Sequence, residues 1–297
     1  SKVGYKNTFG KCLVIGSSSA YHGAPYFAAS AFMKLGGGYV HIVSTKEAVQ
    51  SIAVSIPEGV LHPHNATRDG TLPHDAINDI ERLGLDMNVI ILGSGLGISP
   101  DTQSLVKDII TCNAFHATPI VIDGDALTIL AENPGWLKNR KPYTTILTPH
   151  PGEMSRLSGL SIQTILGNSL VITKEFSQKW KVFVVLKTAR SILVTEKAAF
   201  INTSGTDTLA TAGTGDVLAG MIAALLSSSQ EIDKVFRTAV FLHGLVGNIL
   251  TEQSLNRSAT ASDVLQTISD ATLRLEVFAQ QQKNRTQPAI PGIRFVP

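Results

Sequence analysis

Short apolar runs rich in β-branched residues recur along the chain, and each is bounded by Gly, Pro or Asp. Runs of this length and composition are typical of buried β-strands. The pattern predicts strands at the following places: Cys12–Ile15, Tyr39–Val43, Val89–Leu92, Ile120–Ile122, Thr145–Leu147, Phe183–Leu186, Ser191–Val194 and Ala199–Ile201.

Helical patterns lie between the earlier strands, at Ala24–Leu35, at Pro100–Phe115 and from about Gly152 onward. Strands that alternate with helices indicate a mostly parallel sheet covered by helices on both faces, which is an α/β fold. The last two predicted strands are too close together for a helical crossover. We expect them to form a hairpin that turns near Glu196 and Lys197, so that the sheet ends in an antiparallel edge.

The C-terminal third of the chain is predicted to be helical. Val217–Leu226 is apolar on all sides, which indicates a fully buried helix, and two more helices are expected at Ile232–Gln253 and Ser262–Phe278. No internal repeat or change in composition marks a second domain. We therefore expect one catalytic domain over residues 1–282, followed by an extended or loosely ordered tail over residues 283–297, a segment rich in proline.

The composition supports a globular protein. Hydrophobic residues make up 43% of the chain and charged residues 16%, which is enough apolar material for a large core. The formal net charge is +2 and the charges of both signs are interspersed, so no basic surface for nucleic acid is expected. No segment reaches the ~20 apolar residues of a membrane span, and Cys12 and Cys112 are too few for a disulfide framework. We expect a cytoplasmic protein.

The strongest local motif is Thr211–Asp216 (TAGTGD), immediately before the predicted buried helix. Gly213 and Gly215 allow a sharp turn that brings several backbone N–H groups together, and a helix N-terminus adds partial positive charge. Such a pocket suits a phosphate or a developing anion. Asp216 falls in the first helical turn. Taken alone, the motif is equally consistent with an ordinary loop capped by an aspartate.

Two other Gly-rich segments follow predicted strands. Val89–Gly97 contains GxGxG, but Ile98 stands where a dinucleotide-binding GxGxxG needs its third glycine, so a redox Rossmann protein is disfavoured. Gly93 and Gly95 are instead expected to let a ligand approach the end of the strand. Ile15–Pro25 suits either a polar substrate or a plain connecting turn. The chain contains no GxxxxGK[ST] motif, which excludes a Walker-A site.

Thr148–Glu153 (TPHPGE) joins a predicted strand to a helix and contains two prolines. The prolines stiffen the loop, and rigid presentation of His150 and Glu153 suits contacts to a ligand or to water on a metal. The alternative is a surface histidine beside a glutamate favoured by the helix dipole. Three more histidines lie in a region rich in Pro and Asn, and we interpret them as loop residues and not as a zinc site: His62, His64 and His74.

Taken in order, the motifs resemble the ribokinase-like family and, within it, the ADP/ATP-dependent NAD(P)H-hydrate dehydratases. The resemblance spans about residues 10 to 270. The stretches that carry it are YHGAPYFAA, ILGSGLG, VIDGDAL, LTPHPGEMSRL, VVLK, LATAGTGDVLAGMIAALL, AVFLHG and ASDVL.

The resemblance implies a ribokinase-like three-layer sandwich, a mostly parallel central sheet flanked by helices. It also implies a reaction, the dehydration of the hydrate of NADH or NADPH with Mg²⁺ and with ADP or ATP as co-substrate. Phosphorylation of the ring hydroxyl creates a good leaving group, which the ring nitrogen then expels. The enzyme would thus be a hydro-lyase with a kinase-like mechanism.

The resemblance also implies roles for individual residues. Asp216 is the expected catalytic base, and the loop with Gly213, Thr214 and Gly215 is expected to hold the transferring phosphoryl group. Glu153 is expected to contact a metal through water. The residues expected to bind the hydrated dinucleotide are Ala24, Gly95, His150 and Asp216. Those expected to bind the nucleotide are Lys187, Thr188, Ala189, Arg190, Ser191 and Gly215.

The chain departs from the family pattern at three places. Ala212 precedes Gly213 where the family has a second glycine, Thr188 follows Lys187 where glycine is usual, and GSSS follows the first strand where the family has GGS. One alternative is a hydroxymethylpyrimidine or hydroxyethylthiazole kinase, which would share Asp216 and the anion-binding turn. Another is a binding protein that has kept the pocket and lost turnover, and the intact Asp216, Gly213 and Gly215 count against it. The family further implies a homo-oligomer and an NAD(P)H-hydrate epimerase as partner, fused or separate.

Overall fold

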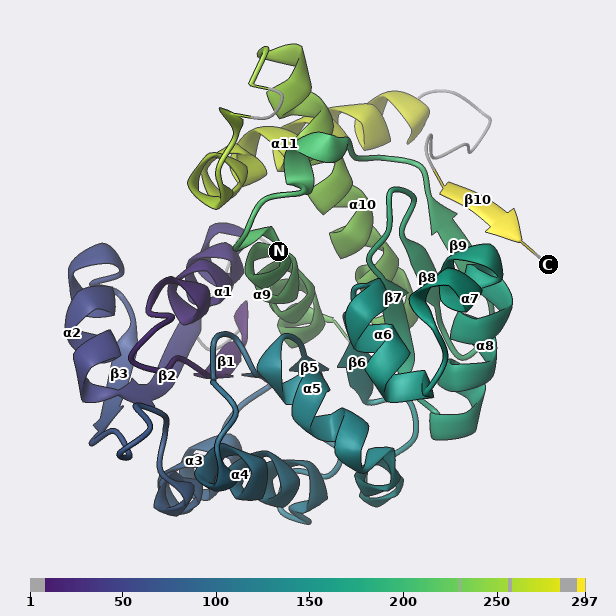
Figure 1. Cartoon of the computed structure of the whole chain (residues 1–297). Helices are drawn as coiled ribbons and strands as arrows, with labels where there is room; N and C mark the ends of the chain where they lie inside the picture. Colours follow the sequence, from purple (N-terminus) through teal and green to yellow (C-terminus); the bar gives the residue numbers. More distant parts are fainter. Residues whose placement is uncertain (1–8, 230, 256–257, 284–292, 297) are drawn as a thin grey trace.

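The computed structural model describes residues 9–229, 231–255, 258–283 and the backbone of 293–296 (Figure 1). Its centre is a ten-stranded sheet with the order β10-β9-β8-β7-β6-β5-β4-β1-β2-β3. The strands are β1 Lys11–Ile15, β2 Tyr39–Thr45, β3 Val60–His64, β4 Val89–Leu92, β5 Ile120–Ile122, β6 Thr145–Leu147, β7 Phe183–Leu186, β8 Ile192–Val194, β9 Ala199–Asn202 and β10 Ile293–Val296.

All pairings from β3 to β7 are parallel, whereas β8, β9 and β10 pair antiparallel. The predicted mixed sheet and the predicted hairpin are therefore confirmed, and the turn closes with Thr195 N–H donating to Ala198 O at 2.9 Å. Strand β10 forms the edge beyond β9. It lies within the predicted tail, while residues 284–292 fall outside the described part of the chain.

Strand β3 was not predicted, and the loop assignment of His62 and His64 was wrong. Both belong to β3, which pairs with β2 in the register Val43↔His62. Proline cannot donate to a ladder, but an edge strand leaves one side unpaired and so accommodates Pro63. The mixed sequence VLHPH lacks the apolar run by which the central strands are recognised. His74 lies in a short 3₁₀ helix.

Helices cover both faces of the sheet (Figure 1). Successive residues of a strand point to opposite faces, so Leu13 and Ile15 join one core cluster, and Cys12 and Val14 the other. The helices are α1 Gly23–Lys34, α2 Lys46–Ser55, α3 Ile77–Gly84, α4 Pro100–Thr111, α5 Asp125–Glu132, α6 Pro151–Ser158, α7 Ile162–Gly167, α8 Ser169–Trp180, α9 Thr214–Ser228, α10 Ile232–Glu252 and α11 Ala261–Lys283.

Helix α9 is the buried helix that the apolar segment predicted. It packs against α1, α10 and the sheet, and its side chains from Val217 to Ala224 are all buried. Gly220 is required where α1 crosses, because a Cβ atom there would lie 2.1 Å from the Ala28 carbonyl oxygen. This packing fixes the N-terminus of α9, which carries Asp216, beside the carboxyl ends of the central strands. Among the described residues, no helix is long and apolar enough to cross a membrane.

Candidate functional site

The TAGTGD turn places Asp216 at the third residue of α9. Gly213 is the N-cap with φ 90°, and a Cβ atom on it would lie 2.9 Å from Ala261 Cβ, so glycine is needed here. The Thr214 hydroxyl donates to Leu209 O at 2.7 Å and to Thr211 O at 2.8 Å. Ala212 is not among the residues with positive φ, so its methyl group is accommodated without backbone strain.

Not all backbone amides of the turn are available to a ligand. The Thr214 amide donates to Thr211 O at 3.3 Å. The amides of Gly215 and Asp216 follow at the start of α9, where helix geometry offers no partner. The helix dipole adds partial positive charge at the same point. This arrangement provides a binding place for an anion directly beside the Asp216 carboxyl group.

A charged cluster lies across from Gly215. Lys187, at the end of β7, donates a hydrogen bond from Nζ to Asp123 Oδ1 at 2.8 Å. Thr148, at the end of β6, donates to the same oxygen at 2.7 Å. Asp123 follows β5 and is 4% exposed. A Cβ atom on Gly215 would lie 3.3 Å from Lys187 Nζ, so the ion pair sits directly against the first turn of α9.

The cluster controls the proton affinity of Asp216. Burial, and to a smaller extent the negative charge of Asp123, raise the pKa of Asp216 to about 7, while the Ser94 hydroxyl and Lys187 act in the opposite direction. A carboxyl group that titrates near neutral pH can both accept and release a proton under physiological conditions. Asp216 therefore has the proton affinity of a general base.

His150 and Glu153 form a capping box at the start of α6. Glu153 Oε2 accepts the His150 amide at 2.7 Å, and His150 Nδ1 accepts the amides of Gly152 and Glu153 at 2.9 and 3.3 Å. The exposed Nε2 of His150 therefore carries the ring proton. Glu153 is only 5% exposed, and burial raises its pKa to about 7. Its Oε2 lies 3.8 Å from Lys187 Nζ.

Gly95 brings the loop after β4 against the start of α1. A Cβ atom on Gly95 would lie 2.7 Å from Tyr21 Cβ and 3.1 Å from Ala24 Cβ, so a side chain is excluded. Ser17, in the loop after β1, has an unusual φ of 78°. Its amide donates a hydrogen bond to Ser94 O at 2.8 Å and so holds this loop against the loop after β4. The predicted dinucleotide residues Ala24 and Gly95 thus meet, next to Ser94 and Asp216.

Gly93 has a different role from the one we expected. A Cβ atom there would lie 2.1 Å from the Asp123 carbonyl oxygen and 2.6 Å from Ala126 Cβ. Protein atoms fill the space beside it, and its φ of 117° lets the loops after β4 and β5 pack together. Gly93 therefore serves the packing that positions Asp123, and no room for a ligand exists at its Cα.

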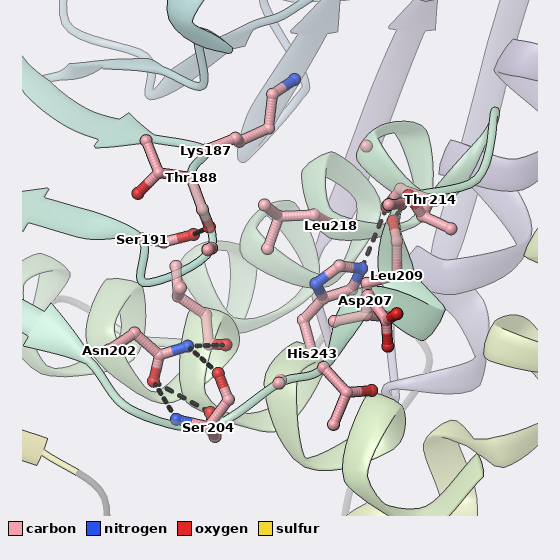
Figure 2. Close-up of a pocket in the computed structure, with 17 residues that line it drawn as sticks. Lys187, Thr188, Ser191, Asn202, Ser204, Asp207, Leu209, Thr214, Leu218 and His243 are labelled. Carbon is pink, nitrogen blue, oxygen red and sulfur yellow. Dashed lines mark hydrogen bonds between the residues drawn. The ribbon is translucent and has the colours of Figure 1, made fainter. Parts of the chain in front are cut away.

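A cavity of about 490 Å³ begins at Lys187 and Gly215 and extends between the β7–β8 turn and α10 (Figure 2). Its wall contains nearly all the residues predicted to bind a nucleotide, but not Arg190. The Thr188 hydroxyl donates to Arg190 O at 2.7 Å. The lining residues are Lys187, Thr188, Ala189, Ser191, Asn202, Ser204, Gly205, Thr206, Asp207, Leu209, Ala210, Thr214, Gly215, Leu218, Val240, His243 and Gly244.

Sequence reasoning gave no role to several residues of the site. Asp123 lies in the quoted stretch VIDGDAL, and its position directly after a buried strand is the signal that could have found it. His243 lies in AVFLHG within a helix, where a histidine is most often a core residue. Ser94 is buried beside Asp216, and its hydroxyl lowers the pKa of that carboxyl group by hydrogen bonding.

The carboxylates suit a hydrated magnesium ion better than a direct metal centre. Among the described residues, no group of three or more His, Cys, Asp or Glu side chains is placed to hold a metal ion. Asp123 and Glu153 lie on either side of Lys187 at the anion-binding end of the cavity. Mg²⁺ commonly keeps several waters and binds through one or two carboxylates plus phosphates of the substrate. The residues present fit that mode.

Solved structures define the class of the fold. A ribokinase-like superfamily protein from Enterococcus faecalis V583 superposes with a TM-score of 0.79 at 24% identity, over 92% of this chain and 90% of that chain. An ADP/ATP-dependent NAD(P)H-hydrate dehydratase from Bacillus subtilis, co-crystallised with ATP/Mg²⁺, superposes with a TM-score of 0.74 at 23% identity, over 92% of each. A Pyrococcus horikoshii hydroxyethylthiazole kinase gives 0.61 at 13%, over 96% and 94%. The fold is ribokinase-like.

The sequence comparisons identify the family. The family model described as NAD(P)H-hydrate dehydratase matches residues 12–270, and the chain belongs to this family. It is 36% identical over 250 residues to a bifunctional NAD(P)H-hydrate repair enzyme of Thermofilum pendens, covering 84% of this chain and 47% of that protein. It is 30% identical to an ADP-dependent (S)-NAD(P)H-hydrate dehydratase of Lactococcus lactis, covering 85% and 86%. The chain thus spans about half the length of the bifunctional relatives it matches.

Proposed function

We propose that this chain dehydrates the hydrate of NADH or NADPH in a reaction that consumes ADP or ATP. The observation that carries the proposal is the position of Asp216. Its carboxyl group lies at the N-terminus of α9, beside the Lys187–Asp123 pair, and the preceding residue Gly215 lines the 490 Å³ cavity. The family membership and the names of the relatives support the substrate.

The first chemical step is phosphoryl transfer to the ring hydroxyl of the hydrate. Asp216 accepts the hydroxyl proton while the hydroxyl oxygen bonds to the terminal phosphorus, and the bond from that phosphorus to the bridging oxygen breaks. ADP would leave as AMP, and ATP as ADP. In the second step the lone pair of the ring nitrogen expels phosphate by breaking the ring C–O bond, and loss of a proton from the adjacent ring carbon then restores the dihydropyridine.

The residues around Asp216 stabilise the charge that moves in the first step. The amides of Gly215 and Asp216 and the ammonium group of Lys187 face the transferring phosphoryl group, in a setting where positioning and electrostatics dominate. Glu153 and Asp123 would hold a Mg²⁺ ion through water, and a bound Mg²⁺ would neutralise phosphate charge. Because Lys187 already bridges the two carboxylates, the site is assembled before ligands bind.

The hydrated dinucleotide is assigned to the side of Asp216 opposite the cavity. Gly95 packs against Tyr21 and Ala24, and we assign the ring to the surface that these residues form beside Ser94. His150 offers the exposed Nε2–H donor, whose orientation is fixed because Nδ1 accepts two backbone amides. The nucleotide is assigned to the cavity, with Lys187, Thr188, Ala189 and Ser191 as contacts, and Arg190 completes the turn through its carbonyl group.

The biological setting belongs to the same proposal. The bifunctional relatives are about twice as long as the matched region, so we assign this chain a partner activity, an NAD(P)H-hydrate epimerase, on the same or a separate polypeptide. The substrate and nucleotide are cytoplasmic metabolites, which makes the cytoplasm the expected location. We further assign a homo-oligomeric state, to be tested by light scattering.

A recovery assay tests the function. Purified protein is incubated with Mg²⁺ and NADH hydrate, with ADP and ATP in separate reactions, and the reduced-nicotinamide absorbance is followed. We expect its return with at least one nucleotide, and no return with the Asp216→Asn variant. No return with either nucleotide from folded protein would contradict the proposal, and phosphorylation of hydroxyethylthiazole would instead establish a vitamin-precursor kinase.

A further inference from the structure

His243 is a buried polar residue in the wall of the nucleotide cavity for which the reaction above has no use. It lies on α10 and is 8% exposed. Its Nε2 atom is 3.0 Å from Thr214 O, the carbonyl of the first residue of α9. Figure 2 shows the ring inside the cavity, with one nitrogen on the Thr214 contact and the other turned away from Thr214.

The hydrogen bond to Thr214 fixes the tautomer of the ring. A carbonyl oxygen can only accept, so the proton is on Nε2. Burial lowers the pKa of His243 to about 4, so the ring is neutral at physiological pH. Nδ1 therefore carries a lone pair and acts only as an acceptor. No hydrogen bond joins Nδ1 to a described residue, and Nδ1 is not among the fully enclosed polar atoms that lack a partner, so it is open to the cavity.

The position of Nδ1 in the cavity determines which part of a bound nucleotide it would contact. Thr214 belongs to the turn that holds the phosphoryl group, and His243 contacts that residue directly, so the ring is near the phosphate end of the cavity. The apolar wall formed by Leu209, Leu218 and Val240 suits the base. Between phosphates and base lies the ribose, and its hydroxyl groups are the hydrogen-bond donors of that part.

We propose that His243 is a specificity-determining residue of the nucleotide cavity, and that its Nδ1 atom accepts a hydrogen bond from a ribose hydroxyl of bound ADP or ATP. The inference rests on the proposed function, because it assigns the cavity to the nucleotide. The same ring is bonded to Thr214 through Nε2, so the contact also ties the ribose to the first residue of α9. Nucleotides that lack this hydroxyl group are thereby disfavoured.

The test is a set of binding measurements by titration calorimetry without the hydrate, so that turnover is not required. The ligands are ADP, 2′-deoxy-ADP, 3′-deoxy-ADP and inosine diphosphate. The main variant is His243→Gln, because a glutamine amide can still donate to Thr214 O while no acceptor remains at the Nδ1 position. The matched control is His116→Gln, the same substitution at an exposed histidine outside the cavity.

We expect one of the two deoxy analogues to bind wild-type protein about 10-fold more weakly than ADP, as loss of one hydrogen bond implies. His243→Gln should lose a similar factor for ADP and show no further loss with that analogue, while His116→Gln should behave like wild type. Equal binding of ADP and both deoxy analogues overturns the proposal. The proposal is also overturned if the deoxy analogue loses the same affinity relative to ADP in wild type and in His243→Gln. It is overturned as well if only inosine diphosphate binds more weakly than ADP.

The remaining outcomes distinguish failure of this inference from failure of the proposed function. If His243→Gln fails to fold, as judged by its thermal transition, the wild-type ligand series still decides the question. If NADH is recovered in the assay above but removal of each ribose hydroxyl has no effect, only this inference fails. If no adenine nucleotide binds and no NADH is recovered, the proposed function fails with it.

Discussion

Lys187 and Asp123 form an ion pair of 2.8 Å between residues that are 64 positions apart in the chain. Burial alone would lower the pKa of Lys187, but the carboxylates of Asp123 and Glu153 raise it above its usual value, and the residue stays charged. The ammonium group lies beside Gly215 and acts on Asp216 as well. The positive charge of Lys187 thus stabilises the ionised carboxylates on which the proposed chemistry depends, those of Asp123, Glu153 and Asp216.

Replacing Lys187 with methionine should therefore impair both binding and chemistry. Lys187 lowers the pKa of Asp216, so its loss should move the acid limb of the pH–rate profile to higher pH. We expect turnover to fall by about 10²-fold or more, since an electrostatic contact to the transferring group is lost. Steady-state kinetics across pH measure both effects. The matched control is Lys179→Met at an exposed lysine over Trp180, and an unchanged pH profile in Lys187→Met would contradict the assignment.

Asp216→Asn should separate nucleotide binding from catalysis. The amide cannot accept the hydroxyl proton, so turnover should fall by ~10²-fold or more, the usual scale of general acid–base catalysis. The amides at the start of α9 remain, so ADP affinity measured by calorimetry should change little. Asp270→Asn, at an exposed position of α11, is the control. Full activity in Asp216→Asn would show that another group takes the proton.

The same substitution should stabilise the protein at high pH. The pKa of Asp216 is raised in the folded state, from the ordinary value of 3.8 to about 7, so folding favours the protonated form and stability falls as pH rises through this interval. At pH 8 the ionised carboxylate costs on the order of 4 kcal/mol, and asparagine avoids that cost. Thermal unfolding should give a higher midpoint for Asp216→Asn at pH 8, with the difference shrinking toward pH 4. A lower midpoint at pH 8 would refute this account.

Ser94→Ala should shift the pH dependence without removing a catalytic group. The Ser94 hydroxyl is buried and lowers the pKa of Asp216 by hydrogen bonding to its carboxyl group. Its loss should raise that pKa, so the activity should begin to fall at a higher pH as the solution is acidified. The pH profile of kcat/KM reports the change in the free enzyme. Ser177→Ala, another buried serine, which donates to Val182 O away from the site, should leave the profile unchanged.

Gly213 and Gly215 should respond differently to substitution. Gly213→Val places a branched side chain at φ 90° and against Ala261, so we expect a loss of stability of about 1–3 kcal/mol together with loss of turnover. Gly215 does not have a positive φ, and a methyl group there meets only Lys187 Nζ at 3.3 Å and Asp123 Oδ2 at 3.4 Å. Gly215→Ala should fold normally and lose activity. Chemical denaturation and kinetics distinguish the two, and wild-type kinetics in Gly213→Val would dismiss the anion-binding turn.

Much of the fold could be predicted because its central elements have strong local signals. The strands from β4 to β9 and the helix α9 are continuous apolar segments, and burial on both sides produces that composition directly. The edge strand β3 and the short surface helices α2, α3 and α7 were not predicted. They have mixed sequences and owe their conformation to contacts with the sheet and with neighbouring helices.

The sequence by itself determined the α/β class and the position of Asp216 at the start of a buried helix, since glycine spacing and apolar periodicity are local properties. The family was predicted from the resemblance of the ordered motifs. Only the tertiary structure decided which groups surround Asp216. Asp123, Ser94 and Lys187 come from separate strands, and His243 comes from a helix that packs beside the cavity. Their pKa values and hydrogen bonds depend on distances through space, and parallel strands bring such residues to one edge of the sheet however far apart they lie in the chain.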